Sequence, residues 1–455
     1  MSLPKPFPSP VDIQRVKTLR KYELLYSNDQ QSVLLLHELI KKQYAKAADL
    51  IYLAHAIPSR VSEFYGDFVQ GDADKLTIKA LSDTEQGTVT TIVNNNDLHE
   101  KVYDWAVNQS EYGYTVLLGR VEEGDFFIDE ISTDQYFPQP DGSVIFATYK
   151  KDPANDTRLL LYTQHYRVDG KRVVIERKAW ETDADGIATQ EIALQAFGVD
   201  ALAEETIDTL DELPIVQIDN SKRTRWGYGK SDYSDIMPQL SEINERATHI
   251  STALLKNLDA KMQVPPGIID DTGKMKSAEA FEIPDKDTPE PKYIINENPL
   301  LADTREHIMF ELKMVSWITG VPMFELLKSA MPERVEALRM ELFSALRKTD
   351  TKRRKISRAL KDMMRIGFKM LGETVSPEME TGNAITVAFS DVLPVNRLEE
   401  AQIEEIAIRN GITSRKSSMQ RLYGFDEDMA DKELQEINSE TVQTGAVDPQ
   451  KAPTL

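Results

Sequence analysis

The clearest alternation of apolar and polar positions lies between Gly227 and about Leu371, where helical spacing predominates. Its first part predicts a helix of about five turns, because apolar residues recur every three or four positions. We place the N-terminal cap of this helix at Asp232, and Pro238 falls early, where its missing N–H is tolerated. The apolar stripe consists of Leu240, Ile243, Ala247, Ile250, Leu254 and Leu258.

A proline-rich insert over 262–301 separates this helix from a second one. Its six prolines and two glycines exclude a continuous helix. The second helix, predicted over 302–319, has Asp303 as its cap and Glu306 three residues later, a pair typical of a capping box. Gly320 and the proline two residues later end this helix.

A third helical pattern of about ten turns runs from Glu333 to Leu371 and has two opposite faces. The apolar face, which we expect to pack on the core, consists of Ile356, Leu360, Met363, Gly367 and Leu371. The other face is basic and consists of Arg354, Arg358, Lys361, Arg365 and Lys369.

The N-terminal half predicts an α+β fold. Residues 1–70 have mainly helical patterns, whereas 70–220 contain short strands separated by turns such as Asp141-Gly142 and Asp169-Gly170. Strands joined by such tight turns indicate an antiparallel sheet. A further strand at 384–390 is expected to return to this N-terminal sheet. Residues from 396 are helical and acidic, and the last fifteen predict a disordered tail.

Composition narrows the class of protein. The 455 residues include no cysteine, which excludes disulfides, cysteine-ligated zinc and a thiol nucleophile. We expect neither a secretory signal nor a membrane span, because the N-terminus lacks an apolar segment and no long apolar run occurs. The formal net charge of −21 argues against a protein that wraps tightly around nucleic acid.

The sequence matches known catalytic motifs only weakly. The six histidines are scattered and do not pair at helical spacing, so ordinary histidines are favoured over metal ligands. Gly229-Lys230-Ser231 resembles the end of a phosphate-binding loop, but Thr224 occupies the position where that loop requires glycine. Adjacent carboxylates in the insert could hold Mg²⁺, yet nothing nearby supplies a base. We therefore expect no catalytic residue, no metal site and no cofactor; the carboxylates are Asp270, Asp271, Asp285 and Asp287.

The basic face of the third helix stands out in so acidic a chain. A solvated helix face is the ordinary explanation. A basic face can also meet an acidic face of a neighbouring copy, which gives a head-to-tail contact that closes into a ring. We therefore take this face as a candidate subunit interface, and the acidic C-terminal helices as one candidate partner surface.

The order of these parts resembles the phage portal proteins, in particular those of long-tailed, siphovirus-type phages, over nearly the whole chain. The segment GYGKSDYSDIMPQLSEIN is similar to the family's glycine–serine–aspartate motif before the first stem helix. WITGVPMFEL resembles the end of the second stem helix and the start of the tunnel loop, and EALRMELFSALRKTDTKRRKISRAL resembles the long helix that follows. Arg334-Val335 departs from the family, in which many members have Ser-Gly.

The resemblance implies a portal-type subunit with named parts. These are an α/β wing (1–230), an antiparallel stem of two helices (231–261 and 302–319), a clip (262–301), a tunnel loop (320–335), a long wing helix with a returning strand (336–395), and a helical crown with a flexible tail (396–455).

The resemblance also implies a function. A non-enzymatic ring of about twelve subunits would form the head-tail connector at one capsid vertex of the virion, after assembly in the host cytoplasm. Double-stranded DNA would pass through its channel during packaging and ejection. Implied partners are terminase, the major capsid and scaffolding proteins, and a head-completion adaptor. No membrane partner is implied.

Site residues follow from the same resemblance. The DNA-facing candidates on the tunnel loop are Met323, Phe324, Lys328, Met331 and Arg334. The partner-docking candidates on the clip are Asp270, Asp271, Lys274, Asp285 and Asp287.

Two alternatives remain open at the level of sequence. One is a Mg²⁺-dependent nuclease or an NTPase of phage DNA processing, which would depend on Asp270 and Asp271, or on Lys230 and Ser231. The other is a helical scaffold or adaptor without a channel, which would form dimers or filaments in place of closed rings.

Overall fold

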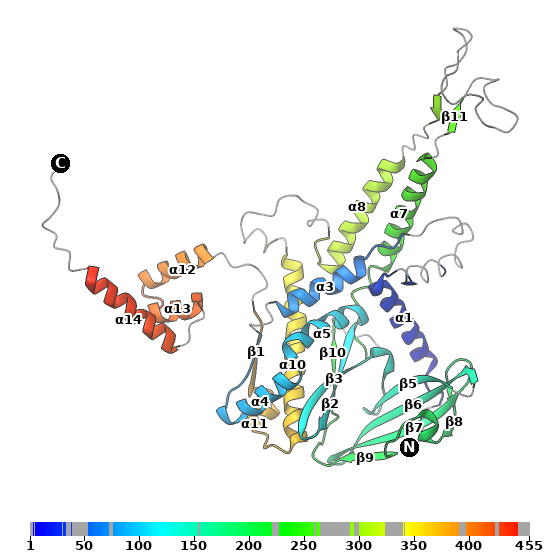
Figure 1. The fold of residues 1–455 in the computed structure, drawn as a ribbon, viewed down its shortest axis with the longest axis horizontal. Helices are drawn as coiled ribbons and strands as arrows, with labels where there is room; N and C mark the ends of the chain where they lie inside the picture. Colours follow the sequence, from blue (N-terminus) through cyan, green and yellow to red (C-terminus); the bar gives the residue numbers. More distant parts are fainter. Residues whose placement is uncertain are drawn as a thin grey trace, which may run out of the picture. The chain divides into compact units, whose positions relative to one another are not determined.

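The computed structural model describes most of the chain. The described residues are 3, 5–29, 31, 32, 38, 53–71, 76–152, 155–220, 227–258, 261–263, 292–294, 300–323, 340, 342–390, 397–423 and 427–444. They form two compact units, of which the larger comprises 1–330 with 341–392, and the smaller comprises 331–340 with 393–455. Figure 1 shows the elements of both units.

A three-stranded antiparallel sheet with the order β10-β2-β3 lies at the centre of the larger unit. Helices α4, α5 and α10 pack on it, and their apolar faces share one core that includes Ile92, Trp105, Leu117 and Met363. The bounds are α4 Asp83–Asn95, α5 Leu98–Tyr112, β2 Tyr114–Glu122, β3 Asp125–Ile131, β10 Ile215–Asp219 and α10 Phe343–Leu371.

A second antiparallel sheet has the order β4-β5-β6-β7-β8, with β9 also paired to β7. Phe7 packs on one of its apolar clusters, and α6 contributes Phe197 to another. The bounds are β4 Tyr136–Pro138, β5 Val144–Asp152, β6 Asn155–Asp169, β7 Arg172–Thr182, β8 Ala188–Ile192, α6 Leu194–Phe197 and β9 Glu204–Ile207; the 3₁₀ turn η3, Thr133–Gln135, precedes β4. The predicted antiparallel α+β fold is confirmed.

Strand β13 confirms the predicted return of the chain to an N-terminal strand, with one correction. It pairs antiparallel with β1 in a separate two-stranded sheet, and does not join either larger sheet. The short helix α11 precedes it. The bounds are β1 Thr77–Ala80, α11 Pro377–Glu380 and β13 Ile385–Ala388.

Two long helices, α7 and α8, pack against each other beside α1 and α3. They share a cluster of buried residues that includes Tyr65, Tyr233, Leu240 and Val315. The segment between them contains β11 and β12, which form an antiparallel pair. The chain therefore turns back after α7, and α8 runs in the opposite direction (Figure 1). The bounds are α1 Pro10–Ser27, α3 Ile57–Gln70, α7 Met237–Leu258, β11 Lys261–Gln263, β12 Lys292–Ile294 and α8 Leu300–Thr319.

Two predicted helix caps are wrong. Helix α7 begins at Met237, so Asp232 does not cap it and lies in a preceding turn. Helix α8 begins at Leu300, so Asp303 lies within its first turn, where a carboxylate still favours the helix dipole. Leu254, at the C-terminal part of the predicted apolar stripe, is 52% exposed.

The smaller unit contains three helices in its described part. They are α12 Arg397–Arg409, α13 Arg415–Tyr423 and α14 Glu427–Thr444. The helical prediction from 396 onwards is thus confirmed as far as Thr444.

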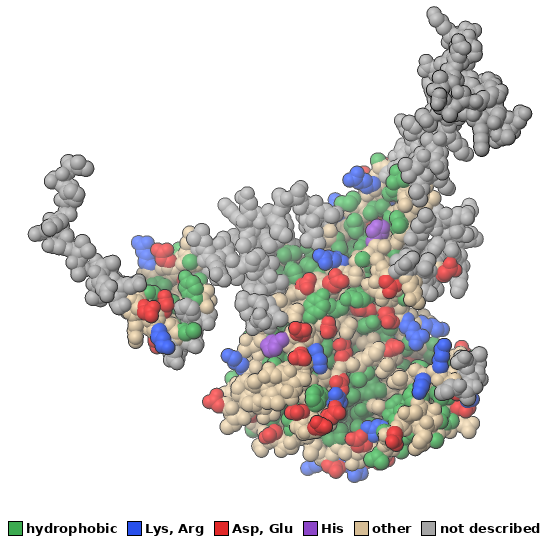
Figure 2. All heavy atoms as spheres, viewed as in Figure 1, with side chains coloured by type: hydrophobic (Ala, Val, Ile, Leu, Met, Phe, Trp, Pro, Cys, Tyr) green, Lys and Arg blue, Asp and Glu red, His purple; other side chains and the backbone are tan. Residues whose placement is uncertain are grey.

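The surface is mixed in charge. On the face in Figure 2, acidic and basic side chains are interspersed over the larger unit, and hydrophobic side chains gather over the α7–α8 pair. Among the described residues, none of the helices has both the length and the apolar character needed to cross a membrane.

Candidate functional site

The Gly-Lys-Ser-Asp sequence lies in the turn before α7 and docks on the C-terminal end of α5. A helix leaves its last carbonyl groups without partners inside the helix. Here the Ser231 hydroxyl donates to the carbonyl oxygen of Glu111 at 2.5 Å, and the backbone N–H of Asp232 donates to that of Ser110 at 3.0 Å. The end of α5 is therefore capped by this turn.

Gly229 allows this close approach. A Cβ atom at this position would overlap the carbonyl oxygen of Gly113, which ends α5 with a positive φ of 90°. Glycine is required here for backbone packing. The structure thus shows this sequence as a turn that precedes a helix and packs on the end of α5.

A buried ion pair joins this turn to α10. The ammonium nitrogen of Lys352 lies 3.1 Å from Oδ2 of Asp232, and both side chains are largely buried. The same nitrogen donates to the Asn220 side-chain oxygen and lies 4.7 Å from the centre of the Tyr65 ring. Ser110 donates a further hydrogen bond of 2.7 Å to Asp232. The charges are therefore paired and hydrogen-bonded, as burial requires.

Burial alone would raise the pKa of Asp232. The nearby Lys352 and Lys348 cations and the hydrogen bonds from Ser110 and Asn220 outweigh it, so the pKa of this carboxyl group is lowered. Asp232 is therefore ionised at neutral pH. Removing Lys352 would leave the negative charge of Asp232 unpaired in the interior.

Lys348, one turn earlier on α10, holds the C-terminal end of α8. Its ammonium group donates hydrogen bonds of 2.8 Å to the carbonyl oxygens of Ile318 and Thr319. A cation at a helix C-terminus also interacts favourably with the helix dipole. The Tyr65 hydroxyl of α3 donates to the same Thr319 carbonyl. Gly320, with a φ of 81°, follows at once. These contacts fix the end of α8 on α10 and α3.

We define the junction as the contact region of α3, α5, α7, α8 and α10. It consists of the polar groups just described and of the cluster of buried apolar residues shared by α7 and α8. Beside this cluster, the Ser62 and Tyr233 hydroxyl groups are 2.7 Å apart. Met323 packs against the same apolar cluster. The junction therefore joins the bases of α7 and α8 to the long helix.

One buried carboxyl group in this region is incompletely satisfied. Glu111 is 2% exposed, and its Oε1 has no hydrogen-bond partner among the described residues. Burial raises the pKa of Glu111 to about 8, a hydrogen bond with Tyr112 opposes this rise, and the charge of Glu23 adds to it. Near neutral pH this group is therefore largely protonated.

A cavity of about 540 Å³ opens beside the junction. Ile318 and Phe343 form an apolar part of its lining, and the hydroxyl groups of Ser344 and Thr351 form a polar part. Of its charged groups, Lys230 pairs with Asp235 and Lys352 pairs with Asp232. The remaining cations in the lining are Arg347 and Lys348.

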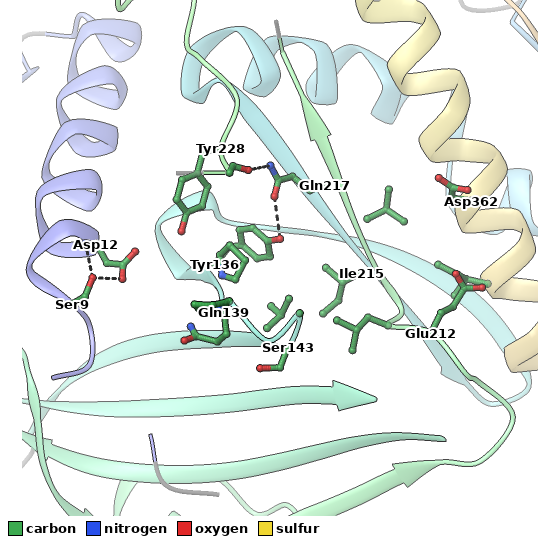
Figure 3. Close-up of a pocket in the computed structure, with 18 of the residues that line it drawn as sticks. Ser9, Asp12, Tyr136, Gln139, Ser143, Glu212, Ile215, Gln217, Tyr228 and Asp362 are labelled. Atoms are coloured by element: carbon green, nitrogen blue, oxygen red, sulfur yellow. Dashed lines mark hydrogen bonds between the residues drawn. The ribbon is translucent and has the colours of Figure 1, made fainter. Parts of the chain in front are cut away.

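A second cavity, of about 850 Å³, lies between α1, β10, α10 and the turn between β4 and β5 (Figure 3). The Tyr136 hydroxyl donates to Oε1 of Gln217 at 3.1 Å across it. Of its carboxylates, Glu212 and Asp362 are paired with Arg365, which also lines it, and Asp12 lies 3.7 Å from Arg15. Its serine hydroxyl groups serve local structure, since Ser9 caps α1 and donates to Asp12 at 2.6 Å, and Ser143 donates to Asp141 at 2.7 Å and lies 2.8 Å from Nε2 of His165. We assign this cavity no chemistry.

The predicted basic face divides into two parts. Arg365 pairs with Glu212 at 2.7 Å, and Lys369 contacts Asp211, Glu212 and Glu380 at 3.0 to 3.1 Å. These two cations hold the 208–213 segment and α11 on the end of α10. Arg354 and Arg358 are exposed and Lys361 is half-buried, so these three remain accessible for an intermolecular contact.

The other predicted site residues, apart from Met323, lie outside the described residues. They are Phe324, Lys328, Met331 and Arg334 of the tunnel loop, and Asp270, Asp271, Lys274, Asp285 and Asp287 of the clip. Within the described part of the chain, no group of three or more His, Asp or Glu side chains could hold a metal ion.

Sequence reasoning missed the roles of Lys352, Lys348 and Glu111. A signal existed for Lys352, since it lies four residues before Ile356 and so continues the buried stripe of α10. Neither Lys348 nor Glu111 has such a signal, because the partners of Lys348 and the groups that bury Glu111 come from distant parts of the chain.

The family model for phage portal proteins of the SPP1 Gp6-like type matches residues 10–445. The chain belongs to this phage portal protein family. The resemblance seen in the stem and tunnel-loop motifs is thus confirmed over nearly the whole length. Comparison with curated protein sequences gives no match.

Solved structures of gene transfer agent (GTA) particles also match this portal chain. The neck of an empty particle, obtained with C6 symmetry, has 13% identity and a TM-score of 0.48, and the match covers 81% of this chain and 90% of that one. A native GTA virion has 12% identity and a TM-score of 0.42, covering 85% and 92%. The neck of a native particle, with C12 symmetry, has 11% identity and a TM-score of 0.42, covering 85% and 92%.

Proposed function

We propose that this portal chain assembles into a closed ring of about twelve copies at one vertex of a phage capsid. The ring forms the channel through which double-stranded DNA is packaged and ejected. It docks terminase during packaging and a head-completion adaptor afterwards, and it contacts the major capsid and scaffolding proteins. Assembly takes place in the host cytoplasm, and the ring remains in the virion.

The observation that carries this proposal is the junction. A stem must keep its position while DNA moves past it. In this chain the bases of α7 and α8 are tied to α10 by the Lys352–Asp232 ion pair and by Lys348. Because the chain belongs to the portal family over residues 10–445, we interpret this anchored pair of helices as the stem.

The remaining parts of the subunit follow from this assignment. The two sheets with their helices and the strand β13 form the wing, the insert 262–301 forms the clip, and the C-terminal helices form the crown. The tunnel loop begins at Gly320, directly after the end of α8. Its start is therefore fixed by Lys348 and Tyr65, and its DNA-facing candidates are those given above.

The net charge of the chain suits a channel through which DNA passes. Tight DNA binding requires many cations that displace the counterions of the phosphates. With a net charge of −21 per chain, a ring offers few such cations, so DNA can slide through it. We infer no catalytic turnover, because the buried charges of the junction, Lys352 and Asp232, are paired with each other and tie two segments of the chain together.

The test is the native mass of the particle together with negative-stain images of the same sample. We expect a ring of roughly 600 kDa with a central hole, which corresponds to about twelve copies. Monomers or dimers at every concentration, combined with nuclease or ATPase activity, would replace the portal proposal with the enzyme alternative.

A further inference from the structure

Helix α10 carries a face that the described residues leave largely exposed. Phe343, Arg347, Arg354, Arg358 and Lys361 follow one another at spacings of three, four or seven residues, so they share one side of the helix. We call these five residues the α10 docking face. It is aromatic at its N-terminal end and basic along the rest.

The aromatic end is shaped to receive a side chain. Phe343 is 64% exposed and lines the 540 Å³ cavity together with Ile318 and Arg347. The residue before Ile318 is Trp317, which is 78% exposed. Exposed large apolar side chains that gather on one surface are typical of a face that another protein covers.

The basic part has little compensation within the subunit. Arg354 donates a hydrogen bond of 3.2 Å to the Thr351 hydroxyl group, and Arg358 approaches Asp362 only to 4.0 Å while remaining 87% exposed. At such exposure an ion pair contributes little. This contrasts with Arg365 and Lys369 farther along the helix, which make close ion pairs.

A complementary surface exists on the C-terminal helical unit, residues 397–444. Ile403 and Ile406 of α12 are 59% and 58% exposed and lie three residues apart, so they share one side. Carboxylates outnumber cations along this unit. Glu405, which precedes Ile406 and lies beside the face of the two isoleucines, is exposed and makes no ion pair among the described residues.

We propose that the C-terminal helical unit of a second copy docks on the α10 docking face. Ile403 and Ile406 cover Phe343 at the mouth of the cavity, and the surrounding carboxylates meet the Arg347, Arg354 and Arg358 cations. The inference rests on the proposed ring, because a contact between two different surfaces of one chain repeats from copy to copy and closes by rotation. It assigns one subunit contact of that ring.

Charge complementarity favours the C-terminal helical unit over other partners of the α10 docking face. Another α10 docking face would bring like charges together, which is destabilising. DNA would satisfy the arginines but would leave the exposed Phe343 uncovered. An acidic helix with two exposed isoleucines matches both parts.

Cysteine cross-linking tests the contact directly, because the natural chain has no cysteine. Two single variants, Phe343→Cys and Ile406→Cys, carry different tags, are co-expressed, and are oxidised after ring isolation. We expect a disulfide-linked dimer that contains both tags. The matched control replaces Phe343→Cys with Lys171→Cys, at an exposed turn between β6 and β7, and should give no such dimer.

The outcomes separate this inference from the ring itself. Rings of normal mass without the mixed-tag dimer would overturn the contact and leave the ring proposal intact. A mixed-tag dimer from small, non-ring species would support the contact and count against the ring. Dimers linked through two Phe343→Cys chains would show a two-fold contact and overturn the head-to-tail arrangement.

Charge reversal gives an independent measurement. The double variant Arg354→Glu/Arg358→Glu should lower the fraction of chains in rings by about tenfold at fixed concentration and low salt. Adding Glu405→Lys should restore part of it. The control double variant Lys151→Glu/Lys171→Glu changes the net charge equally and should assemble like the wild type. Equal loss in both double variants would contradict the contact.

Discussion

At the scale of single residues, the most informative side chains are those whose charge the fold has buried. Lys352 belongs to the most basic stretch of the chain, yet its ammonium group lies in the interior against Asp232, Asn220 and Tyr65. The pair contributes specificity more than raw stability, because desolvation offsets much of its Coulomb attraction. It fixes one register of α10 against the turn before α7.

Breaking this pair should be costly. Lys352→Met leaves the Asp232 charge buried without its partner, and we expect a loss of about 3–5 kcal/mol of unfolding free energy. Adding Asp232→Asn removes the stranded charge and should recover part of the loss. Urea denaturation of the single and double variants measures both. Arg358→Met on the exposed side of the same helix is the control, and an equal effect there would rule out the assigned role.

Glu111 should make stability depend on pH. Its folded-state pKa of about 8 lies above its ordinary value of 4.5, so between these pH values the folded state keeps a proton that the unfolded state has released. The unfolding free energy therefore falls as pH rises through this window, by up to about 1.4 kcal/mol per pH unit.

The variant Glu111→Gln cannot ionise and should lose this slope, so that it exceeds the wild type in stability at pH 8.5. Denaturation midpoints between pH 5 and 9 measure the effect. Glu100→Gln, an exposed change on the same helix, should keep the slope of the wild type. Parallel curves for Glu111→Gln and the wild type would refute the prediction.

At the scale of elements, the end of α8 is the most instructive. A helix terminus usually finds its cap in adjacent residues or in water. Here the cap comes from Lys348 on another helix, and Gly320 then turns the chain away. Helix α10 thus holds the ends of α7 and α8 through its buried side chains, and its exposed side chains carry the proposed α10 docking face.

Removing this cap should loosen only the end of α8. For Lys348→Met we expect faster amide hydrogen exchange in the last turn of α8, with a loss of about 1–2 kcal/mol in local opening free energy. Peptides from the middle of α7 should exchange as in the wild type. Lys361→Met on the same helix serves as the control. Unchanged exchange at Ile318 and Thr319 would show that Lys348 is not the cap.

At the scale of the whole molecule, two features matter. The described chain forms two compact units, and the acidic balance extends over both. A protein with this charge can surround DNA without holding it, whereas its local basic face on α10 remains available to acidic protein surfaces. In the proposed ring, assembly through charge and passage of DNA would thus use different parts of the molecule.

The ring should therefore bind DNA weakly. At physiological salt we expect no stable complex with double-stranded DNA in a gel-shift experiment, and little change in retention as salt is raised. A basic DNA-binding protein run in parallel shows that the gel can detect binding. A tight complex with a steep salt dependence would contradict the proposed sliding channel.

Much of the fold could be predicted from local pattern. The helices around Leu240 and Ile356, and the hairpins at Asp141-Gly142 and Asp169-Gly170, follow from periodicity and turn chemistry, and the structure confirms them. The helix starts were predicted wrongly, because Asp232 and Asp303 have the chemistry of caps but other partners competed for Asp232. The candidate site was predicted only as a motif, since Gly229 and Ser231 are near in sequence but act on α5.

The sequence by itself determined the α+β class, the order of parts, the family and the two faces of α10, because these depend on spacings within about ten residues. Only the tertiary structure decided which charges are buried and which remain free. Lys352 and Arg358 lie six residues apart on one helix, yet Lys352 is buried against Asp232, Asn220 and Tyr65, and Arg358 is 87% exposed. Pairing energies depend on distance and on the surrounding dielectric, and both are set by contacts between segments far apart in the chain.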